Sequence, residues 1–255
     1  MDQLLAARSA ERVRMDGLKD DRRAVIGGGV SVLLAVFDLL EIGQMQAAQG
    51  ALRHGVLYDL LDREHGETDL RSTTVQRLAT KFAADAAQAQ RVGQVACHLL
   101  RQLRAGSDGA AALARHELKL GWAAQLHEIG SRISHSDYHK HGAYILDNAD
   151  APGFAQPELH RLSLLVLGHR GKLRKLDADF NDTLFVHQLM CLRLAVILCH
   201  ARRDPDLKGL QLQGDGQAVT LVLRSDWATA YPQSAHLLRE ETVAWQKTPW
   251  VLALG

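Results

Sequence analysis

The side chains able to do chemistry gather in residues 127–175, where histidines alternate with lysines and arginines. The histidines are His127, His135, His139, His141 and His169, and the cations are Lys140, Arg170, Lys172, Arg174 and Lys175. Neutral imidazoles with carboxylates bind metal ions, whereas guanidinium, ammonium and imidazolium groups bind phosphate oxygens. The stretch therefore predicts either a metal site or an anion site, and protonation of the histidines below about pH 6.5 would strengthen an anion site.

A smaller group of charges precedes three glycines near the N-terminus. The segment DDRR at 20–23 leads into the glycines at 27–29. Consecutive glycines let backbone amides approach an anion closely, although the same run also suits a flexible turn before an apolar helix. Arg53 is a further candidate anion contact, with a salt bridge at a domain interface as the alternative.

The composition is that of an ordinary globular protein, with 47% hydrophobic and 23% charged residues in a chain of 255. The net charge is +1 with histidine neutral, so any preference for anions must be local, and we expect no nucleic-acid partner. Three cysteines without a CxxC pair favour a reduced, cytoplasmic setting. We find no secretory signal and no apolar run of the roughly 18 residues that a membrane span needs.

The elements that must position these groups are helices, because apolar residues recur at helical spacing between residues 72 and 203. The pattern predicts helices over residues 75–82, 92–103, 118–129 and 184–200, a loop at 106–109 and a helix opened by Pro157. The most apolar segment, 184–200, is expected at the centre of this unit. Upstream, we predict an apolar helix at 30–40, a short strand at 44–49 and a helix at 51–61.

Beyond Pro205 the apolar pattern changes from helical to alternating. Residues 210–212 and 218–222 flank the Gly-Asp-Gly triplet at 214–216, which predicts a β-hairpin turning at that triplet. A helix at 237–245 and a strand at 250–254 complete a small α/β appendage.

Several stretches resemble one known family. Residues 126–130 (LHEIG), residues 138–152 and the pair His169-Arg170 resemble the helical domain of the exopolyphosphatase and guanosine pentaphosphate phosphohydrolase family. Residues 50–61 (GALRHGVLYDLL) resemble the segment joining that domain to the family's actin-like core. The resemblance implies a mainly α protein. Its domains would be the end of a ribonuclease-H-like α/β core at 1–68, an HD-like all-α domain at 69–204 and a small α/β domain at 205–255.

That helical domain is similar to HD-type metal phosphohydrolases, which hold a metal with a first histidine, a His-Asp pair and a later aspartate. The sequence departs from this ligand set at Gln88, Glu128 and Val196. Valine cannot ligate a metal, and an amide is a poor ligand for a divalent cation. We therefore expect no metal site in this chain. His127 is either a phosphate contact or a packing histidine that bonds a backbone carbonyl.

The cluster and the resemblance together imply a set of phosphate-binding candidates: Arg22, Arg53, His127, His139, Lys140, His141, His169, Arg170 and Lys172. In the intact enzyme the implied reaction removes terminal orthophosphate from inorganic polyphosphate with the help of Mg²⁺. No segment matches the family's catalytic half, so we expect no catalytic residue and no cofactor in this chain. Whether Met1 is an internal start or that of a shortened paralogue stays open.

The predicted role is thus to bind inorganic polyphosphate and to form a homodimer, with orthophosphate release requiring the other half. Within the family, a guanosine pentaphosphate phosphohydrolase is the alternative. Two rivals stand outside it: a self-sufficient HD-type metal phosphohydrolase, which Gln88 and Val196 disfavour, and a non-enzymatic dimeric scaffold or alarmone sensor.

Overall fold

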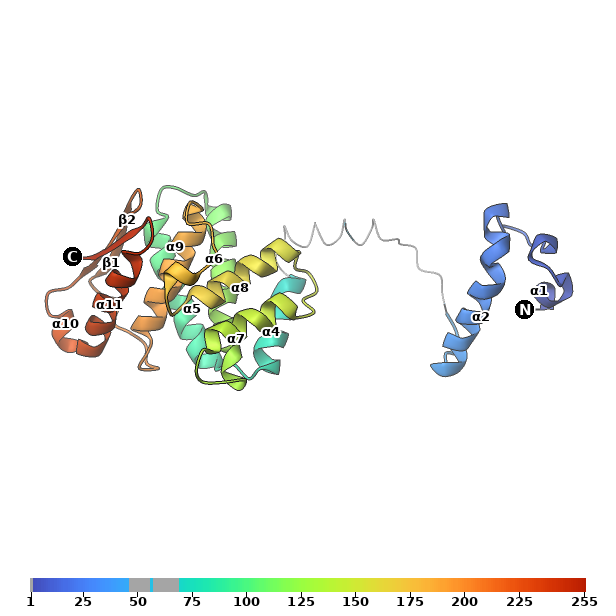
Figure 1. The fold of residues 1–255 in the computed structure, drawn as a ribbon, viewed down its shortest axis with the longest axis horizontal. Coiled ribbons are helices and arrows are strands. Elements are labelled where there is room, and N and C mark those ends of the chain that lie inside the picture. Colours follow the sequence, from blue (N-terminus) through green and yellow to red (C-terminus); the bar gives the residue numbers. More distant parts are fainter. Residues whose placement is uncertain (1, 46–55, 57–68) are drawn as a thin grey trace. The chain divides into compact units, whose positions relative to one another are not determined.

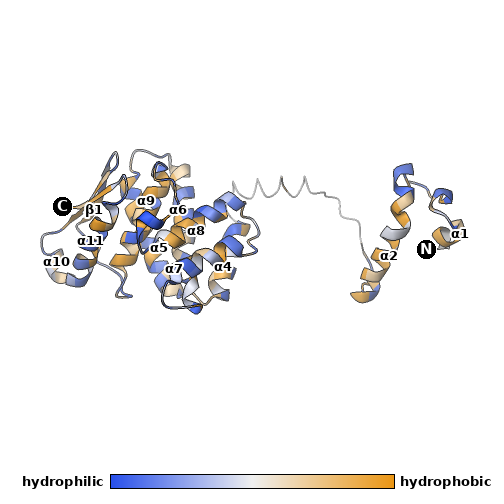
Figure 2. Cartoon of the chain, in the orientation of Figure 1, coloured by the Kyte–Doolittle hydropathy of each residue, from blue (hydrophilic) through white to orange (hydrophobic). Residues whose placement is uncertain are grey.

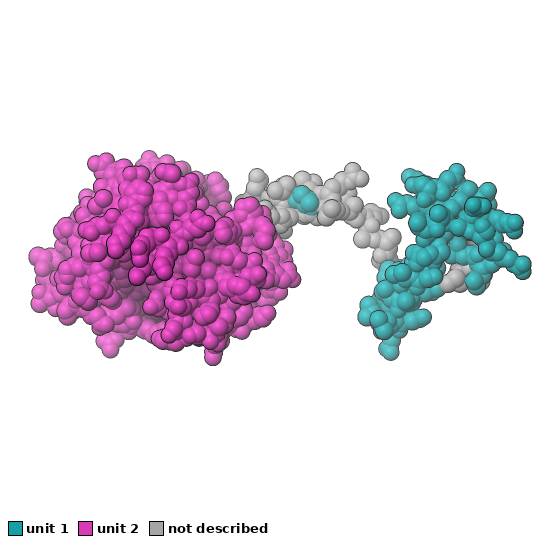
Figure 3. Space-filling view, viewed as in Figure 1, with its two compact units in different colours: residues 1–58 teal, residues 59–255 magenta. Residues whose placement is uncertain are grey.

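The computed structural model describes residues 2–45, 56 and 69–255. The chain divides into two compact units, residues 1–58 and residues 59–255 (Figure 3). The predicted strand at 44–49 falls mostly outside the described residues, and so does the predicted helix at 51–61. Arg53 lies outside them as well.

The first unit is helical in its described part. It contains α1 (Asp2–Ala7), the 3-10 turns η1 (Ala10–Arg12) and η2 (Asp20–Arg22), and α2 (Arg23–Leu39). The helix predicted at 30–40 is present, but α2 begins seven residues earlier and includes the glycines at 27–29, so the alternative of a flexible turn there is wrong. Glycine costs a helix roughly 0.5–1 kcal/mol relative to alanine, yet α2 continues through all three glycines. Within the described residues α2 buries none of its side chains, although much of it is apolar (Figure 2).

The second unit is built mainly from helices (Figure 1). They are α4 (Leu70–Lys81), α5 (Ala86–Leu103), α6 (Ala110–Leu126), α7 (Tyr138–Asn148), α8 (Gln156–Gly168) and α9 (Thr183–Leu198), with 3-10 turns η3 (Ile129–Arg132) and η4 (Leu173–Lys175). Aspartates begin three of these helices. The carboxylates of Asp69, Asp85 and Asp182 accept bonds from backbone amides in the first turns of α4, α5 and α9. These local signals explain why the helices start where they do.

Several helices begin earlier than predicted, and α6 departs furthest. The pattern placed a helix over 118–129, but α6 begins at Ala110 and ends at Leu126. Its first turns are rich in alanine, which has the highest helix propensity but adds little to an apolar stripe. The periodicity therefore missed the first eight residues of this helix.

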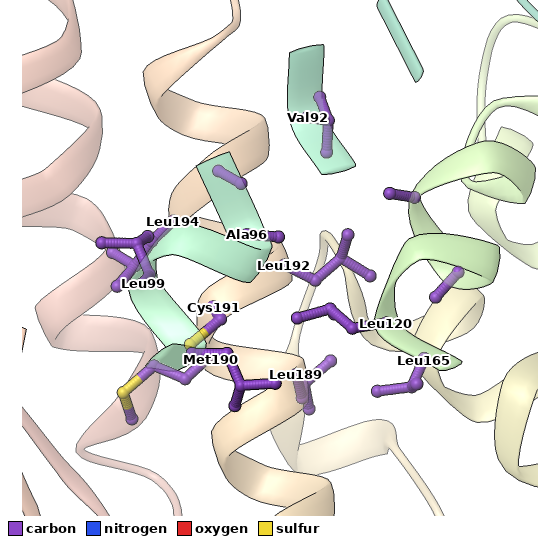
Figure 4. Close-up of a cluster of buried hydrophobic side chains, with 14 of the residues drawn as sticks. Val92, Ala96, Leu99, Leu120, Leu165, Leu189, Met190, Cys191, Leu192 and Leu194 are labelled. Carbon is purple, nitrogen blue, oxygen red and sulfur yellow. The ribbon is translucent and has the colours of Figure 1, made fainter. Parts of the chain in front are cut away.

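The core surrounds α9, which buries 12 of its 16 residues. Leu189 and Leu192 of α9 lie among Ala96 of α5, Leu120 of α6 and Leu165 of α8 (Figure 4). The prediction that this segment is central is confirmed. A helix buried on nearly every side must find partners inside the protein for its polar residues, which here include Gln188 and Arg193.

The C-terminal residues form a small α/β layer against the helices. Strands β1 (Leu210–Asp215) and β2 (Ala218–Leu223) pair antiparallel, and β3 (Val251–Leu254) adds parallel to β2. Helices α10 (Trp227–Ala230) and α11 (Pro232–Trp245) connect β2 to β3. The hairpin is confirmed, but its turn falls at Gly216-Gln217 because β1 continues through Asp215.

The predicted fold class, mainly α with a small C-terminal α/β part, is confirmed. Leu210, Leu252 and Leu238 belong to the same buried cluster as the helices, so residues 205–255 share the core of residues 69–204. None of the helices in the described residues is long and apolar enough to cross a membrane.

Candidate functional site

A surface pocket of about 560 Å³ opens where α7 begins and α8 ends. The start of α7, the end of α8, the loop after it and η4 contribute its walls. The lining residues are Asp137, His139, Lys140, Leu167, Gly168, Arg170, Gly171, Lys172, Leu173, Lys175 and Leu176. Two segments some thirty residues apart in sequence, around positions 139 and 171, thus meet at one site. Four of the predicted phosphate-binding residues line it: His139, Lys140, Arg170 and Lys172.

The pocket is strongly cationic. Lys140, Arg170, Lys172 and Lys175 face a single carboxylate, that of Asp137, among the lining residues. The Nζ atom of Lys140 lies 2.9 Å from Oδ2 of Asp137, and this bond lowers the pKa of the aspartate. The positive excess suits a ligand that carries several negative charges. Lys175 belongs to the basic stretch recognised in the sequence but not to the predicted phosphate-binding set, and Asp137 belongs to neither.

His139 forms part of the pocket floor. Its side chain is 8% exposed, and its Nδ1 has no hydrogen-bond partner among the described residues. Burial, followed by the neighbouring charge of Arg170, lowers the pKa of His139. The imidazole is therefore neutral near pH 7. Its unpaired Nδ1 is enclosed and is not exposed to a ligand in the pocket.

His127 and His169 lie beneath the pocket and do not line it. Each Nδ1 bonds the backbone carbonyl three residues earlier, at 2.6 Å: that of Ala124 for His127 and that of Val166 for His169. The carbonyls are acceptors, so each Nδ1 carries the proton. For His127 the structure shows the packing arrangement that the sequence left open.

These two histidines support the cationic wall indirectly. The rings of His127 and His169 are perpendicular, with centroids 5.4 Å apart. Nε2 of His169 lies 3.4 Å from the hydroxyl of Tyr138, and the guanidinium of Arg170 stacks 4.7 Å from the centre of the Tyr138 ring. His169 thus orients Tyr138, which in turn holds Arg170 at the pocket wall.

Burial opposes the expected gain of charge near pH 6 for three of the histidines. Burial lowers the pKa of His127 and His139, and it lowers that of His169 further. A neutral ring in the apolar interior resists protonation because the charged form loses its hydration. In the ligand-free protein the cationic character of the pocket therefore comes from lysine and arginine.

The remaining candidates lie elsewhere. His141 is half-buried on α7 and is not a lining residue of the pocket. Arg22 is in the first unit, where its exposed side chain lies 4.0 Å from Asp21. Their phosphate-binding roles stay predictions, as does that of Arg53.

The positions compared with HD-type enzymes form a different cluster. The amide of Gln88 donates to the carbonyl of Cys199 and accepts from Arg91. Beside it, the guanidinium of Arg202 bonds Asp85 at 2.8 Å and Glu128 at 2.9 Å. A side-chain cation thus neutralises these carboxylates, and no group of three or more His, Cys, Asp or Glu side chains suited to a metal occurs in the described part of the chain.

Comparison with known proteins identifies the family to which the chain belongs. The model of Ppx/GppA phosphatase domain III matches residues 70–242, and that of the Ppx/GppA phosphatase family matches residues 1–64. The chain belongs to the Ppx/GppA phosphatase family. In this family's terms, the pocket, the core helix α9 and the Arg202 cluster all lie within domain III.

Relatives within the Ppx/GppA family share one described activity. The chain is 35% identical over 257 residues to a guanosine-5'-triphosphate,3'-diphosphate pyrophosphatase of Pseudoalteromonas translucida, covering 99% of this chain and 51% of that protein. Proteins of the same description from Vibrio atlanticus and Aeromonas hydrophila are 34% and 32% identical, each over 98% of this chain and 50% or 51% of their own length. The chain therefore spans about half the length of these curated relatives.

Proposed function

We propose that this chain is the C-terminal portion of a guanosine pentaphosphate phosphohydrolase and that its cationic pocket binds the phosphates of the substrate. The observation that carries the proposal is the convergence of Lys140, Arg170, Lys172 and Lys175 on one pocket above a buried His139. The descriptions of the relatives support the nucleotide over the polyphosphate that the sequence first suggested.

The pocket chemistry also favours a nucleotide. Of the three leucines that line the pocket, Leu173 and Leu176 are buried in the core, and the half-buried Leu167 is the one that can offer apolar surface to a base. The volume of about 560 Å³ lies in the range of small-ligand sites. Inorganic polyphosphate remains the competing ligand, because the cationic wall would bind either polyanion.

The residues of this chain would hold and orient the substrate. Lysine and arginine neutralise phosphate oxygens, and the neutral His139 can donate to or accept from a bridging group. The Mg²⁺ implied for the family would stabilise the charge of the transferring phosphoryl group. Among the described residues no group of three or more His, Cys, Asp or Glu side chains is suited to a metal, and no step of this proposal passes through a metal.

Calorimetric titration tests the ligand and the site. The parent, an Arg170→Ala/Lys172→Ala variant and a control Arg239→Ala/Lys247→Ala variant are titrated with guanosine pentaphosphate, GTP and polyphosphate at two salt concentrations. Loss of two partly exposed charge contacts should weaken pentaphosphate binding by about 1–2 kcal/mol, or about 5–30-fold, and flatten its salt dependence. The control loses the same charges from exposed positions outside the pocket and should bind as the parent does.

The titration can reject the proposal in two ways. Equal affinity of the parent and the pocket variant would remove the pocket as the site. Tight binding of polyphosphate with no binding of guanosine pentaphosphate would restore the exopolyphosphatase assignment.

We also propose a homodimer in the cytoplasm. Leu33, Leu39 and Leu40, on and just after α2, are exposed apolar side chains that a second surface would cover. The three cysteines are free thiols, which suits a reducing compartment. Light scattering at micromolar concentration tests the association, and a monomeric mass would count against it.

A further inference from the structure

Arg193 of α9 joins the pocket to the C-terminal helix. Its side chain is buried, at 4% exposure. On one side, Nε and one terminal nitrogen bond the two carboxylate oxygens of Glu241 on α11 at 2.5 and 2.7 Å. On the other side, the guanidinium bonds the carbonyl of Gly168 at 2.6 Å and that of Gly171 at 3.3 Å.

The two carbonyls bracket the loop that carries the pocket's arginine. Gly168 ends α8, Gly171 has a left-handed φ of +80°, and Arg170 lies between them. Both glycines line the pocket, and a Cβ atom on Gly171 would lie 3.2 Å from Nε2 of His139. Fixing these two carbonyls therefore sets where Arg170 projects and how closely the backbone approaches His139.

The network continues into the C-terminal layer. Glu241 also accepts a hydrogen bond from Nε1 of the buried Trp245, at 2.6 Å. A desolvated ion pair contributes little net stability compared with well-packed apolar residues, but its planar, multiply bonded geometry can fix a loop. Arginine suits this position because four of its bonds point in set directions, which an ammonium group cannot reproduce.

We infer that Arg193 is a positioning residue of the cationic pocket. Glu241 of α11 contributes to the phosphate site by holding Arg193, without touching the ligand. The inference rests on the proposed function only for the identity of the ligand. It predicts that a change on α11, outside the pocket wall, alters the pocket itself.

The test compares Arg193→Lys and Glu241→Gln with the control Arg71→Lys. Arg71 is similarly buried, at 9% exposure, and pairs with Asp69 and Glu158 away from the pocket. Each variant is titrated with guanosine pentaphosphate at a temperature where its thermal melt shows it folded. The side-chain nitrogen signals of His139 are recorded by NMR without ligand. Glu241→Gln keeps the side-chain shape and serves if Arg193→Lys does not fold.

We expect about tenfold weaker binding and shifted His139 signals in both network variants, with the control losing stability but neither affinity nor the native signals. Parent-like affinity and parent-like His139 signals in Glu241→Gln would overturn the inference, as would equal changes in Arg71→Lys. If the parent itself does not bind guanosine pentaphosphate, the proposed function fails. Shifted His139 signals confined to the network variants would then still support the positioning role of Arg193. Unshifted signals would overturn the positioning role as well.

Discussion

Gly171 offers the sharpest test of the pocket geometry. Its φ of +80° lies in the left-handed region, and a Cβ atom there would lie 3.2 Å from Nε2 of His139. Gly106 has nearly the same φ, +79°, but a Cβ atom on it would meet no described atom within 4 Å. The pair Gly171→Ala and Gly106→Ala therefore separates backbone strain, which both share, from crowding at His139, which only Gly171 has.

The magnitudes follow from these two terms. A left-handed backbone costs an L residue about 1–2 kcal/mol, and the reduced freedom of the unfolded alanine chain returns about 0.4–1 kcal/mol. Both variants should thus lose about 1 kcal/mol of unfolding free energy, or about 2–4 °C in Tm for a unit of 150–250 residues. Gly171→Ala should lose somewhat more, because His139 is buried and has little room to give way.

Urea unfolding followed by tryptophan fluorescence measures the free energy of unfolding. Calorimetric titration with guanosine pentaphosphate measures the binding affinity of the pocket. We expect Gly171→Ala to bind about tenfold more weakly, a loss of about 1.4 kcal/mol, and Gly106→Ala to bind as the parent does. Two variants with the same stability and the same affinity would refute the reasoning. In that case the close approach of the loop to His139 does not shape the site.

Three further outcomes can be checked on the purified chain. Burial lowers the pKa of His187 to about 4 from an ordinary 6.5. The unfolded state then takes up a proton that the folded state does not, so stability is lost as the pH falls from 6.5 towards 4. His187→Met should reduce that loss by about 2–3 kcal/mol in urea titrations. Burial raises the pKa of Cys97 to about 11 and that of Cys199 to about 12, with Cys97 only half-buried and Cys199 buried. A thiol reagent at pH 8 should therefore react slowly until urea is added, and rapid labelling of native protein would contradict the raised pKa values. The chain alone should release no orthophosphate from guanosine pentaphosphate or polyphosphate, and release at an enzymatic rate would show that it carries a catalytic site of its own.

The sequence by itself determined the helical second unit and its C-terminal hairpin. Long apolar periodicity and aspartate caps specify α4, α5 and α9 locally, since hydrogen bonds and side-chain stripes within one helix depend on nearby residues. Alanine contributes little to an apolar stripe, so the periodicity did not predict the alanine-rich start of α6. The sequence also located the basic stretch that contains Lys140, Arg170 and Lys172 and identified the family it resembles.

Only the tertiary structure decided which members of that stretch line the pocket. His127 and His169 are buried and each bonds a carbonyl of its own helix end, whereas His139 and Arg170 both line the pocket. The Arg193–Glu241 pair joins residues 48 positions apart, and no local pattern carries that information. Spacing along one helix fixes a face, but the partner that the face meets depends on how distant segments pack together.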